Sequence, residues 1–157
     1  MTTKQNVEDL LAQGQTVQFA PSGISMYPLL DPARGDLVIV RPIERGRDRI
    51  RRGDVVVYRR DGRPGVYDAN GFEQGILVVH RVWKADEETM YLLGDHQSKV
   101  EGPLRTKQVI GIMTARVRGG KTLRVESIPY RLSAGLWLML RPFRMSILRA
   151  AKCLLRR

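Results

Sequence analysis

This sequence of 157 residues has little cysteine and no long apolar run. Its single cysteine, Cys153, excludes an internal disulfide bond and a zinc site built on cysteines. The N-terminal residues lack the apolar core of a signal peptide. The longest nearly apolar run, LSAGLWLML at 132–140, is far shorter than the roughly twenty residues of a membrane-spanning helix. We therefore expect a cytoplasmic protein, either free or held at the surface of a membrane.

Acidic residues are absent from the C-terminal end of the chain. The net charge is +11, and residues 131–157 hold six arginines and one lysine without an acid. This distribution indicates a basic tail at 131–157 that follows a domain at 1–130 with an almost ordinary balance of charge. No pattern of stacking aromatic residues accompanies the charge, so nucleic-acid binding ranks behind the other interpretations.

Short β-branched and alternating stretches recur along the domain and predict strands. They lie at 16–20, 36–40, 54–59, 76–84, 88–95, 108–118 and 122–128. Gly119-Gly120 is a favoured hairpin turn, and four glycines at 61–75 predict a long loop. With a short helix at 6–12, the pattern predicts a mainly β domain, either a sandwich or a coiled partial barrel.

The stretch PSGISMYPLL at 21–30 is either an ordinary turn or the site of a nucleophile. Gly23 lets the backbone turn sharply, and Pro28 withholds an N–H group from any sheet. Together they are expected to place Ser25 at the lip of a sheet with its own N–H group free. A serine hydroxyl needs an adjacent base to act as a nucleophile.

His80 is the strongest candidate for that base. In the stretch ILVVHRVW, it shares one face of the predicted strand with Val78 and Val82. Apolar neighbours keep an imidazole neutral and able to accept a proton. The alternative is a core histidine bonded to a backbone carbonyl. His96, in the predicted turn GDHQS, is expected to be exposed.

A catalytic histidine also benefits from an orienting carboxylate. Asp95 and Glu101 flank a turn that follows the strand expected beside His80. Asp36 and Asp54 each follow a glycine at the start of a strand, where we expect them to cap turns.

Six short motifs, in this order and at this spacing, resemble the superfamily of signal peptidases and LexA-like serine proteases. They are GISMYP at 23–28, GDLV at 35–38, GDVV at 53–56, HRV at 80–82, GD at 94–95 and VIG at 109–111. The resemblance covers residues 15–118. It implies the coiled β-sheet of that fold, with a short N-terminal helix and a C-terminal amphipathic helical tail.

The resemblance also implies roles for individual residues. Ser25 matches the nucleophile, and His80 falls where one branch of the superfamily carries a histidine base and bacterial signal peptidases carry lysine. Asp95 and Glu101 match that branch's two acids, although the second acid is usually aspartate. Which of the two orients His80 stays open.

Further site features follow from the same resemblance. The oxyanion hole would use the Ser25 N–H group with help from Ser22, and shallow pockets around Met26 would select small side chains. No cofactor or metal ion is expected. The implied function is a serine endopeptidase that cleaves leader- or signal-type peptides or precursor proteins in trans. The alternative is a catalytically silent β module that binds a peptide or a membrane.

The basic tail is predicted to form two helical pieces broken at Arg141-Pro142. In the second piece, one face carries Phe143, Ile147, Ala151 and Leu154 or Leu155, whereas basic residues such as Arg144 occupy other faces. This pattern fits a helix in the interface of an anionic membrane, with Trp137 also at the interface. It fits equally a helix whose apolar face covers the β domain while its arginines lie in water.

Overall fold

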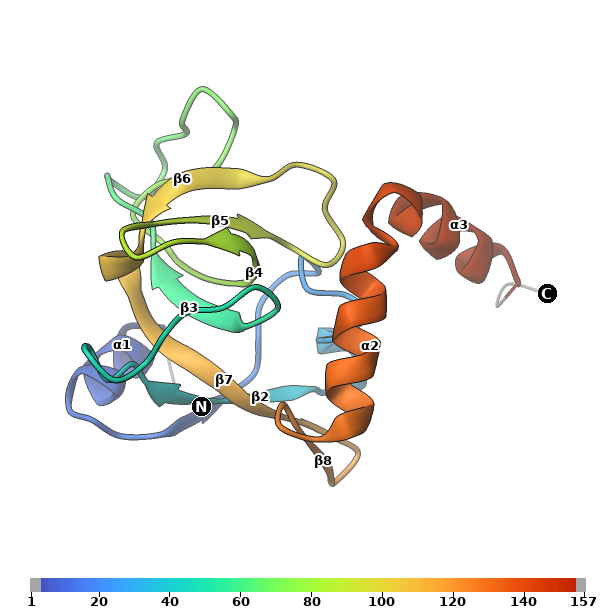
Figure 1. Cartoon of the computed structure of the whole chain (residues 1–157), viewed down its shortest axis with the longest axis horizontal. Helices are drawn as coiled ribbons and strands as arrows, with labels where there is room; N and C mark the ends of the chain where they lie inside the picture. The colour runs from blue at the N-terminus through green and yellow to red at the C-terminus, as the bar shows by residue number, and fades with distance from the viewer. Residues whose placement is uncertain (1–3, 155–157) are drawn as a thin grey trace.

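The computed structural model describes residues 4–154 and is mainly β, as the sequence predicts (Figure 1). Its eight strands form one antiparallel sheet. They are β1 (Val17–Phe19), β2 (Leu37–Pro42), β3 (Val55–Arg59), β4 (Leu77–Ala85), β5 (Thr89–Leu93), β6 (Glu101–Arg105), β7 (Val109–Arg118) and β8 (Lys121–Arg124). The helices are α1 (Lys4–Ala12), α2 (Ile128–Met139) and α3 (Arg144–Leu154), with 3-10 turns η1 (Pro32–Arg34), η2 (Thr106–Gln108) and η3 (Arg141–Phe143).

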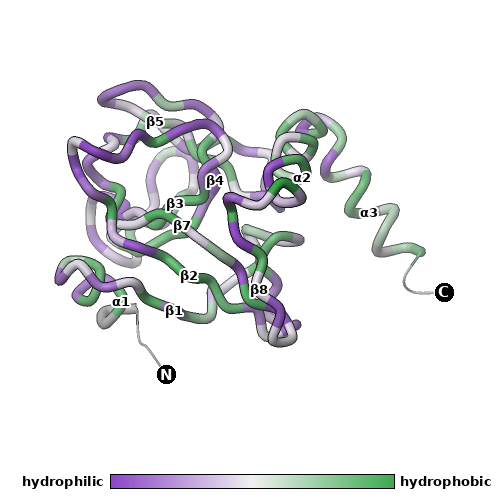
Figure 2. The backbone as a smooth tube through the Cα atoms, turned by 60° about the horizontal axis from the view of Figure 1, so that its bottom comes forward, coloured by the Kyte–Doolittle hydropathy of each residue, from purple (hydrophilic) through white to green (hydrophobic). Residues whose placement is uncertain are grey.

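The sheet curls so that β3 is buried on both faces. The strand order is β1-β2-β7-β3-β4-β5-β6, and β8 pairs with β7. Val55 and Val57 of β3 join a first core with α1, β1 and β2, whereas Val56 and Tyr58 join a second core with β5. The central strands are correspondingly hydrophobic (Figure 2). This alternation lets one strand support two separate layers of side chains.

Two predictions about the strands need correction. The strand β6 was not expected, because its sequence EGPLR contains both glycine and proline, which are rare in strands. The strand predicted at 122–128 is also shorter than expected, because β8 ends at Arg124 and helix α2 already begins at Ile128. The glycine pair 119–120 does form the turn between β7 and β8, as predicted.

Helix α2 packs against the sheet through one side only. Tyr130 and Leu138 are buried, and the side chain of Leu138 lies against Gly53. At the end of α2, Trp83 of β4 stacks between Arg52 and Arg141, whose guanidinium carbons lie 4.3 and 4.6 Å from the ring centroid. These contacts fix the helix against β4.

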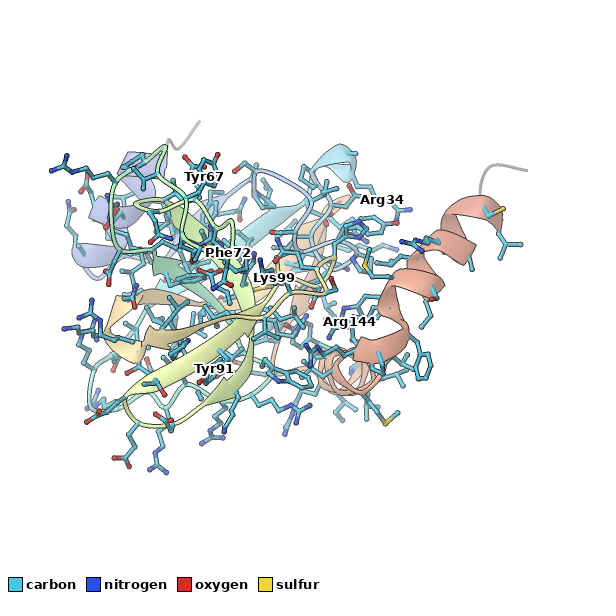
Figure 3. All side chains as sticks on the ribbon, turned by 90° about the horizontal axis from the view of Figure 1, so that it is seen from above. Arg34, Tyr67, Phe72, Tyr91, Lys99 and Arg144 are labelled. Atoms are coloured by element: carbon cyan, nitrogen blue, oxygen red, sulfur yellow. The ribbon has the colours of Figure 1, made fainter. Side chains whose placement is uncertain are left out.

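The expectation that Arg144 lies in water was wrong. Arg144 is only 1% exposed; its Nε donates a hydrogen bond of 2.8 Å to the Trp137 carbonyl, and its guanidinium lies over the Trp137 ring. Figure 3 shows Arg144 between the helices and the sheet. Trp137 is half-buried and lines a pocket against the body of the protein. The break at Arg141-Pro142 is as predicted, whereas Leu155 lies outside the described residues.

Within residues 4–154, no helix is both long and apolar enough to cross a bilayer.

Candidate active site

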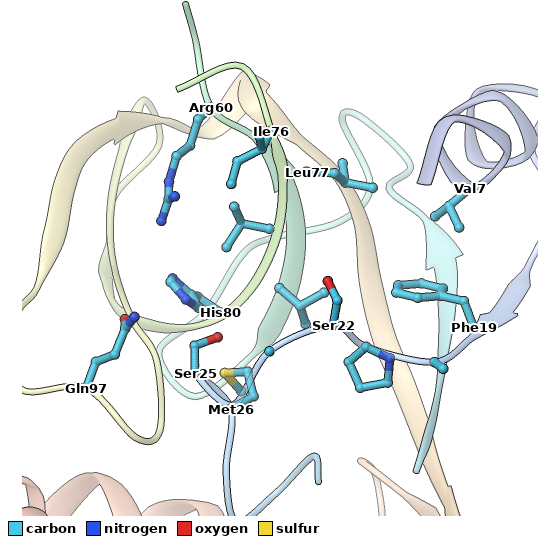
Figure 4. A pocket seen from close by; sticks show the side chains of 15 residues that line it. Val7, Phe19, Ser22, Ser25, Met26, Arg60, Ile76, Leu77, His80 and Gln97 are labelled. Carbon is cyan, nitrogen blue, oxygen red and sulfur yellow. The ribbon is translucent and has the colours of Figure 1, made fainter. Parts of the chain in front are cut away.

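A pocket of about 340 Å³ opens between two backbone segments, 19–23 and 76–80 (Figure 4). Each segment lines the pocket with consecutive residues. Side chains of a strand alternate between faces, so a run of consecutive lining residues means that the edge of the backbone itself faces the cavity. Four of the predicted site residues line this pocket: Ser22, Ser25, Met26 and His80.

Ser25 lies in a turn held on both sides. Gly23 has a φ of +81°, a left-handed conformation that favours glycine. Past the serine, the Leu30 N–H group donates to the Met26 carbonyl at 2.9 Å, and Met26 is buried in the first core. The Ser25 side chain therefore faces the pocket from a turn anchored in the core.

The turn after β5 also holds Ser25. The His96 N–H group donates to the Ser25 carbonyl at 2.8 Å, and a Cβ atom on Gly94 would lie 2.6 Å from the same oxygen. Glycine at 94 therefore permits this close approach. The prediction that His96 is exposed was wrong: the residue is half-buried, and its ring packs edge-on against Tyr27.

The pocket that Ser25 lines also holds hydrogen-bonding groups without protein partners in residues 4–154. Among the described residues, the N–H groups of Ser25 and Met26 donate to no protein acceptor. Ser22 is exposed at the rim of the pocket. The Gln97 Oε1 atom is buried and has no partner within the described chain, and its side chain lines the pocket (Figure 4). These groups can serve a bound molecule.

His80 is 2% exposed and directs Nδ1 into the second core. Tyr58 Oη lies 3.1 Å from His80 Nδ1 and donates a 2.6 Å hydrogen bond to Glu101 Oε2. A phenol has one proton, and Tyr58 gives it to Glu101, so the Nδ1–H group of His80 donates the hydrogen bond to Tyr58 Oη. In a neutral ring with this tautomer, Nε2 is the nitrogen with a free lone pair, the form that a general base requires.

Glu101 carries the negative charge behind this histidine. Arg60 binds it through two hydrogen bonds of 2.6 and 2.7 Å, and His80 Nδ1 lies 3.5 Å from Oε2. Burial opposes ionisation of this carboxyl, but the contact with His80 and the hydrogen bonds from Arg60 and Tyr58 outweigh it and lower its pKa to about 2. Glu101 is therefore ionised at neutral pH.

The structure does not bring Asp95 to His80. Asp95 is 1% exposed and accepts bonds of 2.8 and 2.7 Å from Arg81, the residue after His80. Neighbouring residues of a strand point to opposite faces, so this pair lies across β4 from His80. Of the two candidate acids, the one that contacts the histidine is Glu101.

Two residues of this cluster, Tyr58 and Arg60, were missed in the sequence. Tyr58 lies near the end of β3 and Arg60 just after it, and Tyr58 is paired with Val78, two residues before His80. The stretch DVVVYRR predicts a strand, but only the pairing register of β3 with β4 shows that its end lies near His80. Both capping predictions are confirmed: Asp54 accepts from the Arg51 N–H group, and Asp36 accepts from the Asp31 N–H group. Asp36 is also fully buried and pairs with Arg118.

Among residues 4–154, no three His, Cys, Asp or Glu side chains gather in a way that could hold a metal ion. Comparison with models of known families, with curated proteins and with solved structures finds no match to this chain. The resemblance to signal peptidases and LexA-like proteases stays a prediction.

Proposed function

We propose that this protein is a serine endopeptidase in which Ser25 is the nucleophile and His80 the general base. The observation that carries the proposal is that both residues line one pocket, while the Nδ1 edge of His80 is occupied by Tyr58 and Glu101. The close-up shows the side chains of Ser25 and His80 among those that line the pocket (Figure 4). A serine supplied with an oriented histidine has the two groups that acyl transfer requires.

The proposed reaction begins when Ser25 Oγ attacks a peptide carbonyl and His80 Nε2 takes the hydroxyl proton. Glu101 stabilises the resulting imidazolium, with the Tyr58 hydroxyl between the two groups. The Ser25 N–H group donates to the oxyanion, an interaction worth about 3 kcal/mol for a single donor. His80 then protonates the leaving amine, and water hydrolyses the acyl-enzyme.

An extended peptide suits the shape of the pocket. Strand β4 pairs with β5 only from Arg81 onward, so within the described chain residues 77–80 have no strand partner on that side. A substrate strand could add to this edge and to the facing segment 19–23. We propose leader- or signal-type peptides and precursor proteins as substrates, with small side chains beside Met26.

Cleavage of a diverse peptide library, read by mass spectrometry, tests the proposal. We expect Ser25→Ala and His80→Ala to abolish the cleavages that the wild type makes. Ser98→Ala is the matched control, since Ser98 is exposed and lies outside the pocket. Wild-type cleavage patterns in both site variants would refute the assignment.

A second candidate is the catalytically silent peptide-binding module. One observation favours it: among the described residues, no hydrogen bond joins Ser25 Oγ to His80. In free enzymes such a bond is often long and tightens only on binding substrate. A fluorophosphonate probe separates the candidates, because an activated Ser25 forms a covalent adduct and a silent module does not.

A further inference from the structure

Helix α2 carries an apolar stripe that the rest of the protein does not cover. The stripe comprises Ile128, Leu132, Leu136 and Met139, whose side chains are between 52% and 73% exposed. Their spacings of four, four and three residues keep them on one face of the helix. The opposite side of α2 holds the buried residues Tyr130 and Leu138, so the stripe faces away from the sheet.

The stripe is followed by exposed apolar residues in the next two elements. Phe143 of η3 is 62% exposed, and Ile147 and Leu154 of α3 are 38% and 73% exposed. They recur at intervals of four and seven residues, which again is one helical face. Helix α3 extends away from the body of the protein (Figure 1). Soluble proteins rarely expose so many large apolar side chains on neighbouring elements without a binding partner.

The charge around these residues is of one sign. Arg131 is exposed on α2 beside the stripe, and Arg149 is exposed on α3. Glu126 is the last acidic residue in the sequence. A partner for this surface must therefore offer an apolar layer together with negative charge.

We propose that α2, η3 and α3 dock onto the surface of an anionic membrane. Their apolar side chains would enter the boundary between headgroups and acyl chains, and the arginines would bind the anionic headgroups. A second copy of this chain fits less well, because two such surfaces would bring arginines against arginines. The contacts of Trp83 and Arg144 described above hold the α2–α3 corner in place, so the surface is formed before it binds.

This inference does not depend on the serine chemistry. The stripe lies on α2, whereas Ser25 lies in the pocket between β1 and β4. Ser25→Ala is therefore expected to bind membranes as the wild type does. Loss of serine reactivity and loss of membrane binding can thus be measured separately.

Co-sedimentation with vesicles tests the membrane proposal. We expect the full chain to bind phosphatidylglycerol-containing vesicles, to bind pure phosphatidylcholine vesicles far more weakly, and to be released by high salt. Leu132→Ser with Leu136→Ser is expected to lower the partition coefficient by about tenfold or more. Arg131→Gln with Arg149→Gln should lower it for anionic vesicles only.

The matched control is Val66→Ser with Tyr67→Ser, since these residues are 54% and 63% exposed in the loop between β3 and β4. This variant should bind like the wild type, and circular dichroism with thermal unfolding should show that every variant is folded. Absence of wild-type binding to anionic vesicles, or equal binding by the stripe variant, overturns the proposal. So does a dimer, detected by light scattering, that the stripe substitutions dissociate while vesicles bind none of the variants.

Discussion

On each side of strand β4 lies a buried pair of an arginine and an acid, and the two pairs have different neighbours. On one face Arg60 holds Glu101, and on the other Arg81 holds Asp95; each pair has two hydrogen bonds of 2.6–2.8 Å. Both acids are almost fully buried. Only Glu101 contacts a histidine, His80. A buried acid beside an arginine therefore does not identify a catalytic group; what distinguishes the two faces is the third partner.

That third partner ties each pair to a different part of the molecule. On the His80 face it is Tyr58, which links the acid to the imidazole. On the Arg81 face, Arg81 donates to the Gly53 carbonyl at 3.0 Å and reaches the Tyr130 hydroxyl of α2 at 3.4 Å. The first arrangement fixes the orientation of the imidazole, and the second joins β4 to α2 and to the turn before β3.

The largest effect on stability is expected from Asp95→Asn. The substitution leaves the Arg81 guanidinium buried without a counter-charge, which destabilises a protein by about 3–5 kcal/mol. Urea unfolding measures the loss. The matched control is Asp61→Asn, since Asp61 pairs with Arg105 at the surface and should contribute about 1 kcal/mol or less. Equal losses in the two variants would contradict the structural role of Asp95.

The second-largest effect on stability is expected from acid, which protonates Glu101 behind His80. The Glu101 pKa is about 2 in the folded state against an ordinary value of 4.5. The unfolded chain therefore binds more protons between these values, and stability falls as the pH decreases from about 4.5 to about 2. The contribution at neutral pH is about 3 kcal/mol. Glu101→Gln should flatten this part of the stability curve, and the exposed control Glu126→Gln should not; a Glu101→Gln curve as steep as that of the wild type would refute this prediction.

A smaller effect is expected from Tyr58→Phe. The ring remains, but the hydroxyl between His80 and Glu101 is lost, so the imidazole is less well oriented and the carboxylate loses a donor. We expect the rate of Ser25 labelling by a fluorophosphonate to fall about tenfold and its pH profile to shift. Tyr91→Phe, a partly exposed tyrosine on β5, is the control. An unchanged rate and profile in Tyr58→Phe would remove the tyrosine from the account.

The sequence predicts most strands and the location of the pocket residues, because both follow from local patterns. Alternation identifies β4 and the inward face of His80, and glycine with proline marks the turn that presents Ser25. The hairpin turn at Gly119-Gly120 and the helix break at Pro142 also follow from the conformational preferences of glycine and proline.

The contacts behind His80 could not be predicted, because they depend on how distant strands meet. Glu101 starts a strand whose glycine and proline conceal it, and Tyr58 reaches His80 only through the register of β3 with β4. The choice between Asp95 and Glu101 likewise depends on which face of β4 each acid meets. The burial of Arg144 could not be predicted either, because it depends on stacking over the Trp137 ring of another helix.

The most direct test of the account is the rate at which a fluorophosphonate labels Ser25 in two variants, read by intact mass on folded protein. We predict that His80→Gln slows labelling by about 10²–10⁴-fold, the usual contribution of a general base. Folded Asp95→Asn should label within about threefold of the wild-type rate, because that acid lies on the other face of β4. Labelling that is undiminished in His80→Gln, or abolished to the same degree in folded Asp95→Asn, would contradict the division between the two faces.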